Sequence, residues 1–494
     1  MEQVTPQAPR SPTNACVACT RSKRRCDRAI PSCSYCVRVK RQCAYDEAPV
    51  HTFATPPGGV STDSAVLLEP WAAAIIAHYR TNALSALGSV EKTRRTSRAY
   101  FSSTHYKLAV LSEKKFYERL PSLFTSADSS FITLCLCIHL LQQIPSRSGD
   151  SMVSSLYALA KTGINQLEML RCCSIDTIQS MLLIALYEVG HGIYPAASIS
   201  MASCARAARN LGLHKIRSEP LSGIGDDIGE KRRTWWAIHN LDRFINLFNG
   251  DAIFNSEDAG REDPLPPDDG SPPLEILSSQ SIPTIATPTP FRLGQFAREC
   301  QVAHLVGRVV HHVFNPVSDA HFHEEEAIQL KRTLLSFLPL LIEEELQFSN
   351  YCGALSTCVS SLFTLYSAPL FRAQHRSLDE PRTLIAMEQL SARMAEISDY
   401  FLGVARDENK RFMLSPFVPY ALYQTAVIES RLWEQEGNSQ HKERAYRMVE
   451  LLRYFSNRWA IAGKYIAVLD SPHPPVTLPA QEFYISEEAR VHEP

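Results

Sequence analysis

The sequence predicts a mainly α-helical protein, in which a small cysteine-rich module is joined by a flexible linker to a large all-helical domain. Three observations support this fold class. Six of the 14 cysteines lie between Cys16 and Cys43, residues 47–63 are rich in proline and glycine, and apolar residues from 64 to 465 recur mainly with the period of a helix. At 494 residues the chain is also too long for one ordinary core, so more than one folded unit is expected.

The predicted boundaries follow these changes in composition. They separate a disordered N-terminus at 1–13, the cysteine-rich module at 14–46, the linker at 47–63, the helical domain at 64–465 and a tail at 466–494.

Charge divides the chain in the same way. Hydrophobic residues make up 45% and charged residues 21%, which is typical of a globular protein, and the formal net charge is −2. Residues 1–46 hold nine Lys and Arg against three Asp and Glu, a net charge of +6, so the rest of the chain carries −8. A basic N-terminal segment, followed by an acidic remainder of the chain, predicts that only the N-terminal segment binds a polyanionic partner.

The sequence shows no sign of export or membrane insertion. The first 15 residues lack an apolar stretch, and the longest apolar run, Phe131–Leu141, is far shorter than the roughly 20 residues that span a bilayer. We therefore expect no membrane partner and an action inside the cell, where cysteines serve as metal ligands or buried thiols rather than in disulfides.

The cysteine spacing predicts a metal centre with two ions. The pattern Cys-x2-Cys-x6-Cys occurs twice, and a disulfide framework or chance clustering does not account for its duplication. A zinc ion takes four ligands, so six thiolates satisfy two zinc ions when two of them bridge. The predicted ligands are Cys16, Cys19, Cys26, Cys33, Cys36 and Cys43.

A basic segment lies between the second and third of these cysteines. On a helix that begins near Cys19, four arginines would share one side, with Lys23 near the leading turn. Lys and Arg are the commonest donors to guanine, and the remaining cations would hold phosphates; a solvated basic face is the alternative. The same cations are typical of nuclear import signals. The predicted DNA-binding residues are Arg21, Ser22, Lys23, Arg24, Arg25 and Arg28.

The array resembles the binuclear zinc cluster of fungal transcription factors. The likeness extends beyond the cysteines to Pro31, two residues before Cys33, and to the run Thr20-Arg21-Ser22-Lys23-Arg24-Arg25-Cys26-Asp27. This resemblance implies that Cys16 and Cys33 bridge the two metals, that Pro31 turns the loop through a cis peptide bond, and that Lys23 reads CGG-like triplets in double-stranded DNA. Thr20 is a departure, because the family carries a basic residue there.

Many members of that family follow the cluster with a dimeric coiled coil. Residues 47–63 show no heptad stripe, so we expect a flexible linker instead. Either the protein forms a homodimer through its helical domain, or it binds one half-site as a monomer.

The helical domain shows several periodic segments. A stripe from Ile175 to Val189 follows Ser174, a typical N-cap, and a segment around Trp235 and Trp236 is apolar on both sides. Asp263–Pro290 contains eight prolines and predicts a loop. Further helical patterns lie near residues 65–85, 128–143, 325–346, 384–403 and 440–462.

This domain resembles the regulatory (middle homology) region of the same family, convincingly over residues 70–260. The likeness rests on Ala208–His214 and Arg232–Arg243; the family's usual Gly-Arg-Pro is replaced here by Gly250-Asp251-Ala252. The resemblance implies a domain that restrains transcription and answers a metabolite or partner, in a protein that works with the transcription machinery in the nucleus on a metabolic or secondary-metabolite gene set.

Other reactive side chains have ordinary structural explanations. His214, His239 and Asp242 are chemically able to act in catalysis, and His239 and Asp242 could pair on one helix face. Aromatic core packing around a buried Asp–Arg or Asp–His pair is the simpler interpretation. Cys135, Cys137, Cys172 and Cys173 are interpreted as core thiols. A solvated loop and an acidic helix N-terminus explain the remaining cluster better than a metal site does: His311, His312, His321, His323, Glu324, Glu325 and Glu326.

Three functions remain to be compared. The first is a sequence-specific transcription factor, the second a zinc-dependent interaction protein that binds a protein or RNA, and the third an enzyme with a zinc appendage. The basic segment favours the first. The sequence shows no phosphate-cradling loop and no nucleophile elbow, so we expect no catalytic residue and no cofactor besides zinc.

Overall fold

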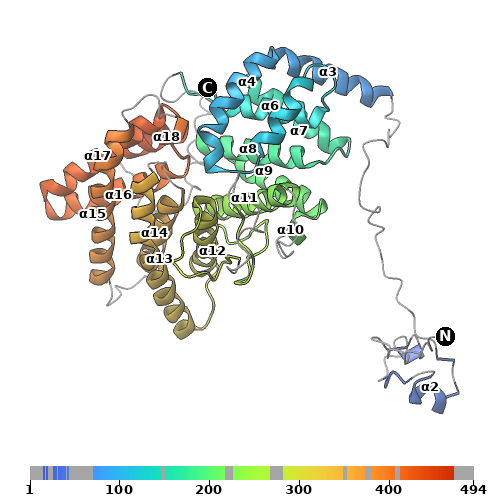
Figure 1. Ribbon diagram of the computed structural model, residues 1–494. Coiled ribbons are helices and arrows are strands. Elements are labelled where there is room, and N and C mark those ends of the chain that lie inside the picture. The colour runs from blue at the N-terminus through green and yellow to red at the C-terminus, as the bar shows by residue number, and fades with distance from the viewer. Residues whose placement is uncertain are drawn as a thin grey trace, which may run out of the picture. The chain divides into compact units, whose positions relative to one another are not determined.

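The computed structural model divides the chain into two compact units, residues 1–71 and residues 72–494 (Figure 1). The predicted N-terminus 1–13 and linker 47–63 lie outside the described residues, as does the tail from 472 onward. The described residues are 15–16, 18–19, 26–29, 32–40, 42–43, 70–146, 151–216, 226–267, 282–348, 353–372, 380–405 and 412–471.

The large unit is helical, as the sequence predicts, and no β-strand occurs among its described residues. None of the helices described combines the length and apolar character that crossing a membrane requires. Its elements are α3 (Pro70–Leu87), α4 (Val90–Phe101), η1 (Thr104–Lys107), α5 (Glu113–Arg119), η2 (Leu120–Ser122), α6 (Ser129–Leu141), α7 (Ser155–Met169), α8 (Ile175–His191), α9 (Ala196–Asn210), α10 (Leu213–Ile216), α11 (Asp226–Asn249), α12 (Gln295–Phe314), α13 (Ala320–Phe348), α14 (Gly353–Arg372), α15 (Glu380–Ala405), α16 (Val418–Glu436), α17 (Ser439–Ser456) and α18 (Ala460–Leu469).

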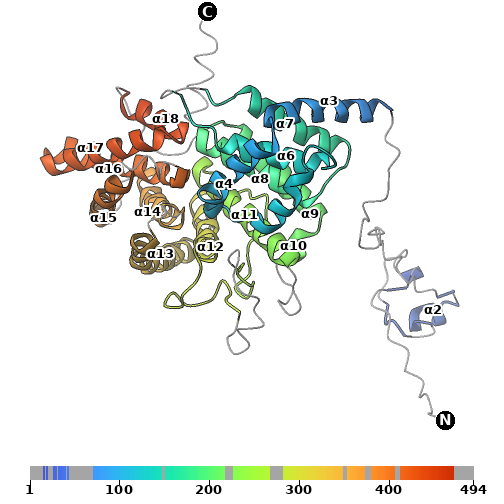
Figure 2. The ribbon, with the colours of Figure 1, turned by 45° about the horizontal axis from the view of Figure 1, so that its top comes forward.

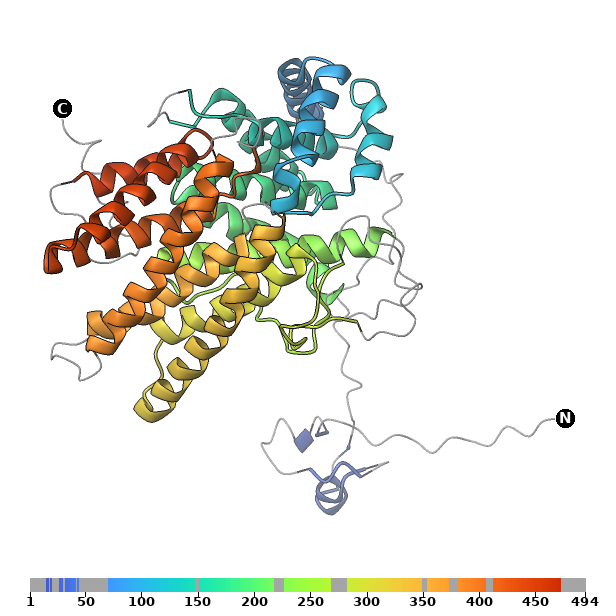
Figure 3. The same ribbon diagram turned by 60° about the vertical axis from the view of Figure 1, so that its left-hand side comes forward.

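These helices form two groups that lie side by side. The blue-to-green helices α3–α11 make one group and the yellow-to-red helices α12–α18 the other in each view (Figures 1, 2 and 3). Helix α11 packs on α12, and α18 returns to pack on α8, so the chain joins the two groups at both places. One apolar core runs through both groups.

Helix α8 is the centre of the first group, with α6, α7, α9 and α11 packed around it. Every residue from Asp176 to His191 is buried. Its start is the predicted one: the Ser174 side chain accepts the N–H of Thr177, whose side chain in turn accepts the N–H of Ser174. The helix ends at Gly192, where φ is +63° and a side chain would strain the backbone.

Helix α11 confirms the expected burial on both sides. Trp235 and Trp236 are each fully buried. The indole N–H of Trp236 donates to the carbonyl oxygen of Pro264 at 3.1 Å, which holds the start of the proline-rich segment against the helix. The described parts of that segment, 263–267 and 282–290, are not helical, as predicted, and meet in an isolated bridge between Pro264 and Thr284.

The helical pattern near 440–462 is two helices rather than one. The chain turns at Arg458 and Trp459, whose side chains form hydrogen bonds with distant parts of the large unit. The Arg458 guanidinium donates to the carbonyl oxygens of Leu141 at 2.5 Å and Gln143 at 3.1 Å, and the Trp459 indole donates to Leu414 O at 2.8 Å. The last helix, α18, runs past residue 465.

The predicted core thiols divide into two pairs. Cys135 and Cys137 are buried in α6, as expected. The interpretation is wrong for the other pair, because Cys172 is half-buried and Cys173 is exposed where the chain passes from α7 to α8. These two cysteines therefore lie in a loop near the surface rather than in the core.

Two helical glycines provide a test of the packing around α8. A Cβ on Gly190 would lie 2.2 Å from Cε3 of Trp459, whereas a Cβ on Gly229 in α11 would meet only the end of Arg233, at 3.7 Å. We predict that Gly190→Ala lowers the free energy of unfolding by about 1–3 kcal/mol through overpacking. The matched control, Gly229→Ala, should leave it unchanged or raise it by up to about 1 kcal/mol. Urea unfolding of the two variants measures the difference, and equal stabilities would contradict this account of the packing.

Candidate metal centre and nucleic-acid interface

The six N-terminal cysteines form two overlapping groups of four sulfur atoms. Within each group all sulfur atoms lie within 4.8 Å of one another, and Cys16 and Cys33 belong to both groups. Cys19 and Cys26 complete the first group, and Cys36 and Cys43 complete the second. This sharing is the arrangement that two metals with six thiolates require.

The sulfur–sulfur distances fit zinc. Sγ of Cys16 lies 3.8 Å from Sγ of Cys33 and 3.6 Å from Sγ of Cys36, and Sγ of Cys19 lies 3.7 Å from Sγ of Cys33. A tetrahedral zinc ion with zinc–sulfur bonds of about 2.3 Å separates its ligands by about 3.8 Å. The donor set and its spacing therefore suit two zinc ions.

The repeated sequence produces a repeated backbone arrangement. The N–H of Cys16 donates to Sγ of Cys26 at 3.5 Å, and the N–H of Cys33, at the equivalent place in the second half, donates to Sγ of Cys43 at 3.3 Å. In the second half Cys33 also caps α2 (Ser34–Arg38), because its sulfur accepts the N–H of Cys36 at 3.4 Å. Each shared cysteine thus orients the last cysteine of its own half.

Asp27 connects the two halves, a role that the sequence did not reveal. Its carboxylate accepts the backbone N–H of Ser34 at 3.1 and 3.2 Å and the Ser34 hydroxyl as well. The hydrogen bond from that hydroxyl is the main reason why the pKa of Asp27 lies below its usual value. The carboxylate therefore holds the first turn of α2. The hint in the sequence is that Asp27 directly follows Cys26, a predicted ligand, at the end of the run that carries the family resemblance.

Burial and hydrogen bonding divide the thiols into two kinds. Cys16, Cys19, Cys33 and Cys36 are fully buried, and burial raises the pKa of Cys19 and that of Cys36, the latter to about 12. The N–H of Cys16 lowers the pKa of Cys26 to about 7. Since zinc binds thiolates, metal binding must displace protons from the buried thiols.

The other clusters considered for metal or catalysis serve structural purposes. No further group of metal-binding side chains occurs in the parts of the chain that the structure describes. The ring of His312 stacks on His323 with centroids 3.8 Å apart, and its Nδ1 lies 3.0 Å from Glu326. The predicted loop and acidic helix N-terminus are wrong in detail. The four histidines lie in α12 and α13, and Glu324–Glu326 follow the first turn of α13, which holds no acidic residue.

Asp242 pairs with an arginine rather than with a histidine. Nδ1 of His239 lies 3.2 Å from the carbonyl oxygen of Glu257, while Asp242 accepts the Arg243 guanidinium at 2.9 Å. The same carboxylate also accepts the backbone N–H groups of Asn255 and Ser256, each at 3.3 Å or less. The sequence analysis interpreted these residues as a buried Asp–Arg pair, and the structure shows that pair. It holds the loop that follows α11 in place.

Only one of the predicted DNA-binding residues lies within the described part of the chain. Arg21–Arg25 and Pro31 are outside it. Arg28 is exposed, but it lies outside any helix and has a φ of +58°, so its predicted place on a helix face is wrong. Residues 26–29 are not helical, and Arg28 lies in an irregular segment with a left-handed backbone conformation.

Fold and site together define a zinc-cluster protein with a helical body, and its relatives fall in the same class. Residues 14–50 match the fungal Zn(2)-Cys(6) binuclear cluster domain, and residues 98–260 match the fungal specific transcription factor domain.

Three proteins of known sequence show partial likeness. Transcription factor BOA15 of Botryotinia fuckeliana is 33% identical over 140 residues, which are 28% of this chain and 76% of that protein. Transcription factor tazR of Aspergillus terreus is 36% identical over 81 residues, 15% of this chain and 12% of the relative. An uncharacterized transcriptional regulatory protein, C530.05 of Schizosaccharomyces pombe, is 26% identical over 168 residues, 32% and 22% of the two chains.

The chain belongs to the family of fungal binuclear zinc-cluster transcription factors. It is a DNA-binding transcription factor whose cluster takes two zinc ions, and the alternative of a zinc-dependent interaction protein is not favoured.

The shared cysteines predict unequal effects of substitution on zinc content. Full-length protein should hold two zinc ions, and Cys16→Ser should lose both, because Cys16 belongs to both sulfur groups. Cys26→Ser, which affects one group, should keep up to one ion, and the exposed Cys173→Ser is the control that keeps two. Metal analysis of the purified variants measures these contents.

Removal of zinc by a chelator should unfold the zinc module, residues 14–46, and leave the helical body, residues 72–494, folded. Structural zinc contributes on the order of 10 kcal/mol to small modules, whereas the helices of the large unit are stabilised by their own apolar core. Far-ultraviolet circular dichroism should therefore change little.

In the metal analysis of the variants, one zinc ion in the unmodified protein, or two in Cys16→Ser, would contradict the sharing of Cys16 between the two sulfur groups.

Proposed function

We propose that the protein acts in the nucleus, where it reads CGG-like triplets in the major groove through residues 14–46 and regulates transcription through its helical body. The overlap of two sulfur groups at Cys16 and Cys33 is the observation that carries this proposal. It makes the module a rigid support for a segment with eight Lys and Arg in residues 14–46. In this proposal all six cysteines are ligands, and the shared pair bridges the metals.

The electrostatics of the module support a nucleic-acid partner. Six thiolates exceed the charge of two zinc ions by two, so residues 14–46 keep a net charge near +4. Such a charge favours association with phosphates, and only contacts to base edges supply sequence preference. We assign the base contact to Lys23 and backbone contacts to Arg21, Ser22, Arg24, Arg25 and Arg28.

An enzymatic role has little support from the described residues. Asp242 and His239 are each committed to structural contacts, and the histidines near α13 stack or pair with glutamate. A mobility shift with randomised duplex DNA separates the candidate functions. Recovery of one consensus supports the transcription factor, and binding to RNA or protein without duplex binding would favour the interaction protein.

Two substitutions test the division between base and phosphate contacts. Lys23→Ala should weaken specific binding by about 1–3 kcal/mol and relax the preferred base, because it removes the donor to guanine. Arg25→Ala should weaken all duplexes by a similar factor and reduce the dependence of affinity on salt. Selection from randomised DNA measures both effects. If Lys23→Ala selected the unmodified protein's consensus, the assignment would be wrong.

We further propose that the acidic body restrains the module. Residues after 46 carry a net charge of −8, and a flexible coil of 17 residues, as predicted for the linker, would have a root-mean-square span of about 23 Å. A tethered acidic surface therefore competes with DNA phosphates for the basic segment, and salt screens this competition. Partners among the transcription machinery would act on the body, and homodimerisation through it is the competing explanation.

Removal of the body distinguishes restraint from dimerisation. A fragment of residues 1–63 should bind a single DNA site at least as tightly as the full-length chain, with the largest difference at low salt. Binding isotherms at fixed salt measure this ratio. A fragment that bound far more weakly would show that the body contributes affinity, as a dimerisation domain does.

A further inference from the structure

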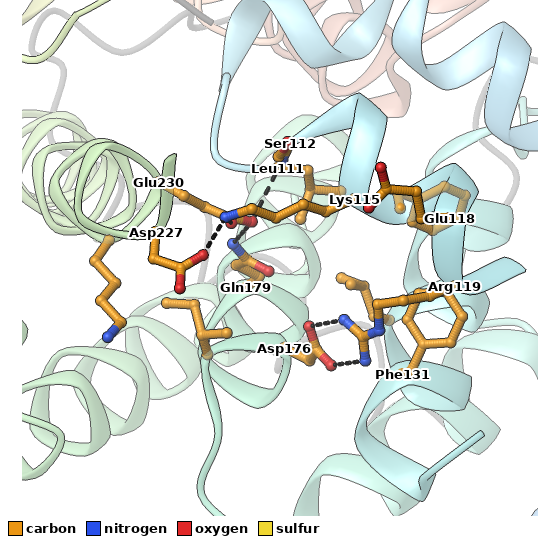
Figure 4. A pocket seen from close by; sticks show the side chains of 14 residues that line it. Leu111, Ser112, Lys115, Glu118, Arg119, Phe131, Asp176, Gln179, Asp227 and Glu230 are labelled. Atoms are coloured by element: carbon orange, nitrogen blue, oxygen red, sulfur yellow. Dashed lines mark hydrogen bonds and ion pairs between the residues drawn. The ribbon is translucent and has the colours of Figure 1, made fainter. Parts of the chain in front are cut away.

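The outer helices of the body differ in what they expose to solvent. Helix α5, in the first group, has the polar surface that is usual for such a helix, because each of its exposed residues is charged: Glu113, Lys114 and Glu118. Its less exposed Lys115 pairs with Asp227 of α11 beside a cavity of about 330 Å³ (Figure 4). Helix α13, in the second group, instead carries a row of apolar residues on its exposed side.

Helix α13 has apolar residues on two sides, of which one is covered. It lies at an edge of the second group and packs on α12 and α14 (Figures 1 and 3). The residues that face these neighbours are buried: Leu330, Leu334, Phe337, Leu338 and Leu341. On the other side, six residues lie within about 40° of one another's mean direction around the helix axis, and we call them the outer row: Ile328, Arg332, Leu335, Pro339, Ile342 and Leu346.

The outer row is exposed although all but one of its residues are apolar. Ile328 is 57% exposed, Leu335 43% and Leu346 44%; Pro339 is exposed as well, and Ile342 is half-buried. The row extends over about 27 Å of helix, and steps of four and three residues alternate along it, which is the spacing of a helix that pairs with another helix. A helix with apolar residues all round is usually buried on both sides. We therefore expect a second helix to cover the outer row.

The charges along the outer row indicate which helix this is, because they complement a second copy of α13. Arg332 lies toward the start of the row and Glu343 toward its end; both are exposed, and they lie about 20° apart around the helix axis. In an antiparallel pair related by a twofold axis, Arg332 of each copy approaches Glu343 of the other, so this contact occurs twice. In a parallel pair each charge would face its own copy and be repelled.

We propose that a second copy of this chain covers the outer row, so that the protein forms a homodimer through antiparallel α13 helices. The same alignment that brings Arg332 to Glu343 places Ile328 against Leu346 and Leu335 against Pro339, so the apolar residues of each copy are covered by those of the other. One helix pair buries less than the roughly 800 Å² per partner of a standard interface, so the dimer is weak, with a dissociation constant in the range of roughly 1–100 μM.

This dimer goes beyond the proposed function. Self-association of α13 does not depend on DNA, whereas one consequence rests on the proposed function: a dimer carries two zinc modules and can occupy two half-sites at once. A single site that is measured far below the dissociation constant of the dimer is bound by the monomer. Dimerisation is therefore compatible with restraint of the module by the acidic body.

Sedimentation velocity of the full-length, zinc-loaded protein tests the interface. Over a series from about 0.1 to 300 μM, the unmodified protein should change from monomer to dimer. Leu335→Glu should raise the dissociation constant about tenfold or more, because it places a charge in the centre of the apolar contact. The matched control is Ile199→Glu, which changes an apolar residue of α9 that is 62% exposed and should leave the constant unchanged.

An exchange of charges tests the antiparallel orientation. Arg332→Glu and Glu343→Arg, made singly, should each raise the dissociation constant about threefold or more, because like charges then meet at two symmetric places. The double variant should restore the constant of the unmodified protein.

The proposal is overturned if the protein is monomeric throughout the series, if Leu335→Glu dimerises as tightly as the unmodified protein, or if the double variant is no tighter than the single ones. DNA is absent from these measurements. Failure of the protein to bind DNA would therefore refute the proposed function and leave the dimer standing, and a monomer that binds DNA would do the reverse.

Discussion

The sharing of Cys16 and Cys33 between two sulfur groups is the constraint on which the N-terminal unit depends. Modules of fewer than about 40 residues rarely bury enough apolar surface to fold unaided. Among the described residues of the module, the fully buried core consists of four cysteines, with the other two packed beside them. Zinc–sulfur bonds are therefore expected to take the place of a hydrophobic core in this module.

The helical body is instead stabilised by burial of apolar surface, and buried charged groups hold its loops in place. Helix α8 is buried almost throughout, and α11 places two tryptophans in the core. The buried Asp242 and Arg243 hold the loop after α11, and Arg458 caps the end of α6. Residues that resemble catalytic or regulatory motifs in the sequence are thus explained by the cost of leaving buried polar groups unpaired.

Local sequence patterns predict part of this structure. The cysteine spacing gave the two sulfur groups, Ser174 marked the start of α8, and apolar periodicity predicted the burial of α11. Other features depend on contacts between distant residues. No sequence pattern near Arg28 predicts its positive φ, and the break before α18 is accompanied by a hydrogen bond from Arg458 to the distant Leu141. The ion pair of Lys115 with Asp227 joins α5 to α11 across more than 100 residues of sequence, so no local pattern could reveal it.

The proposed restraint of the module by the helical body has a physical basis that limits how it can be regulated. Restraint of the module would depend on net charge and therefore on salt. A metabolite or partner that carries little net charge would leave this long-range attraction nearly unchanged. Its binding could alter DNA binding only if the restraining and releasing states of the body differ in affinity for it.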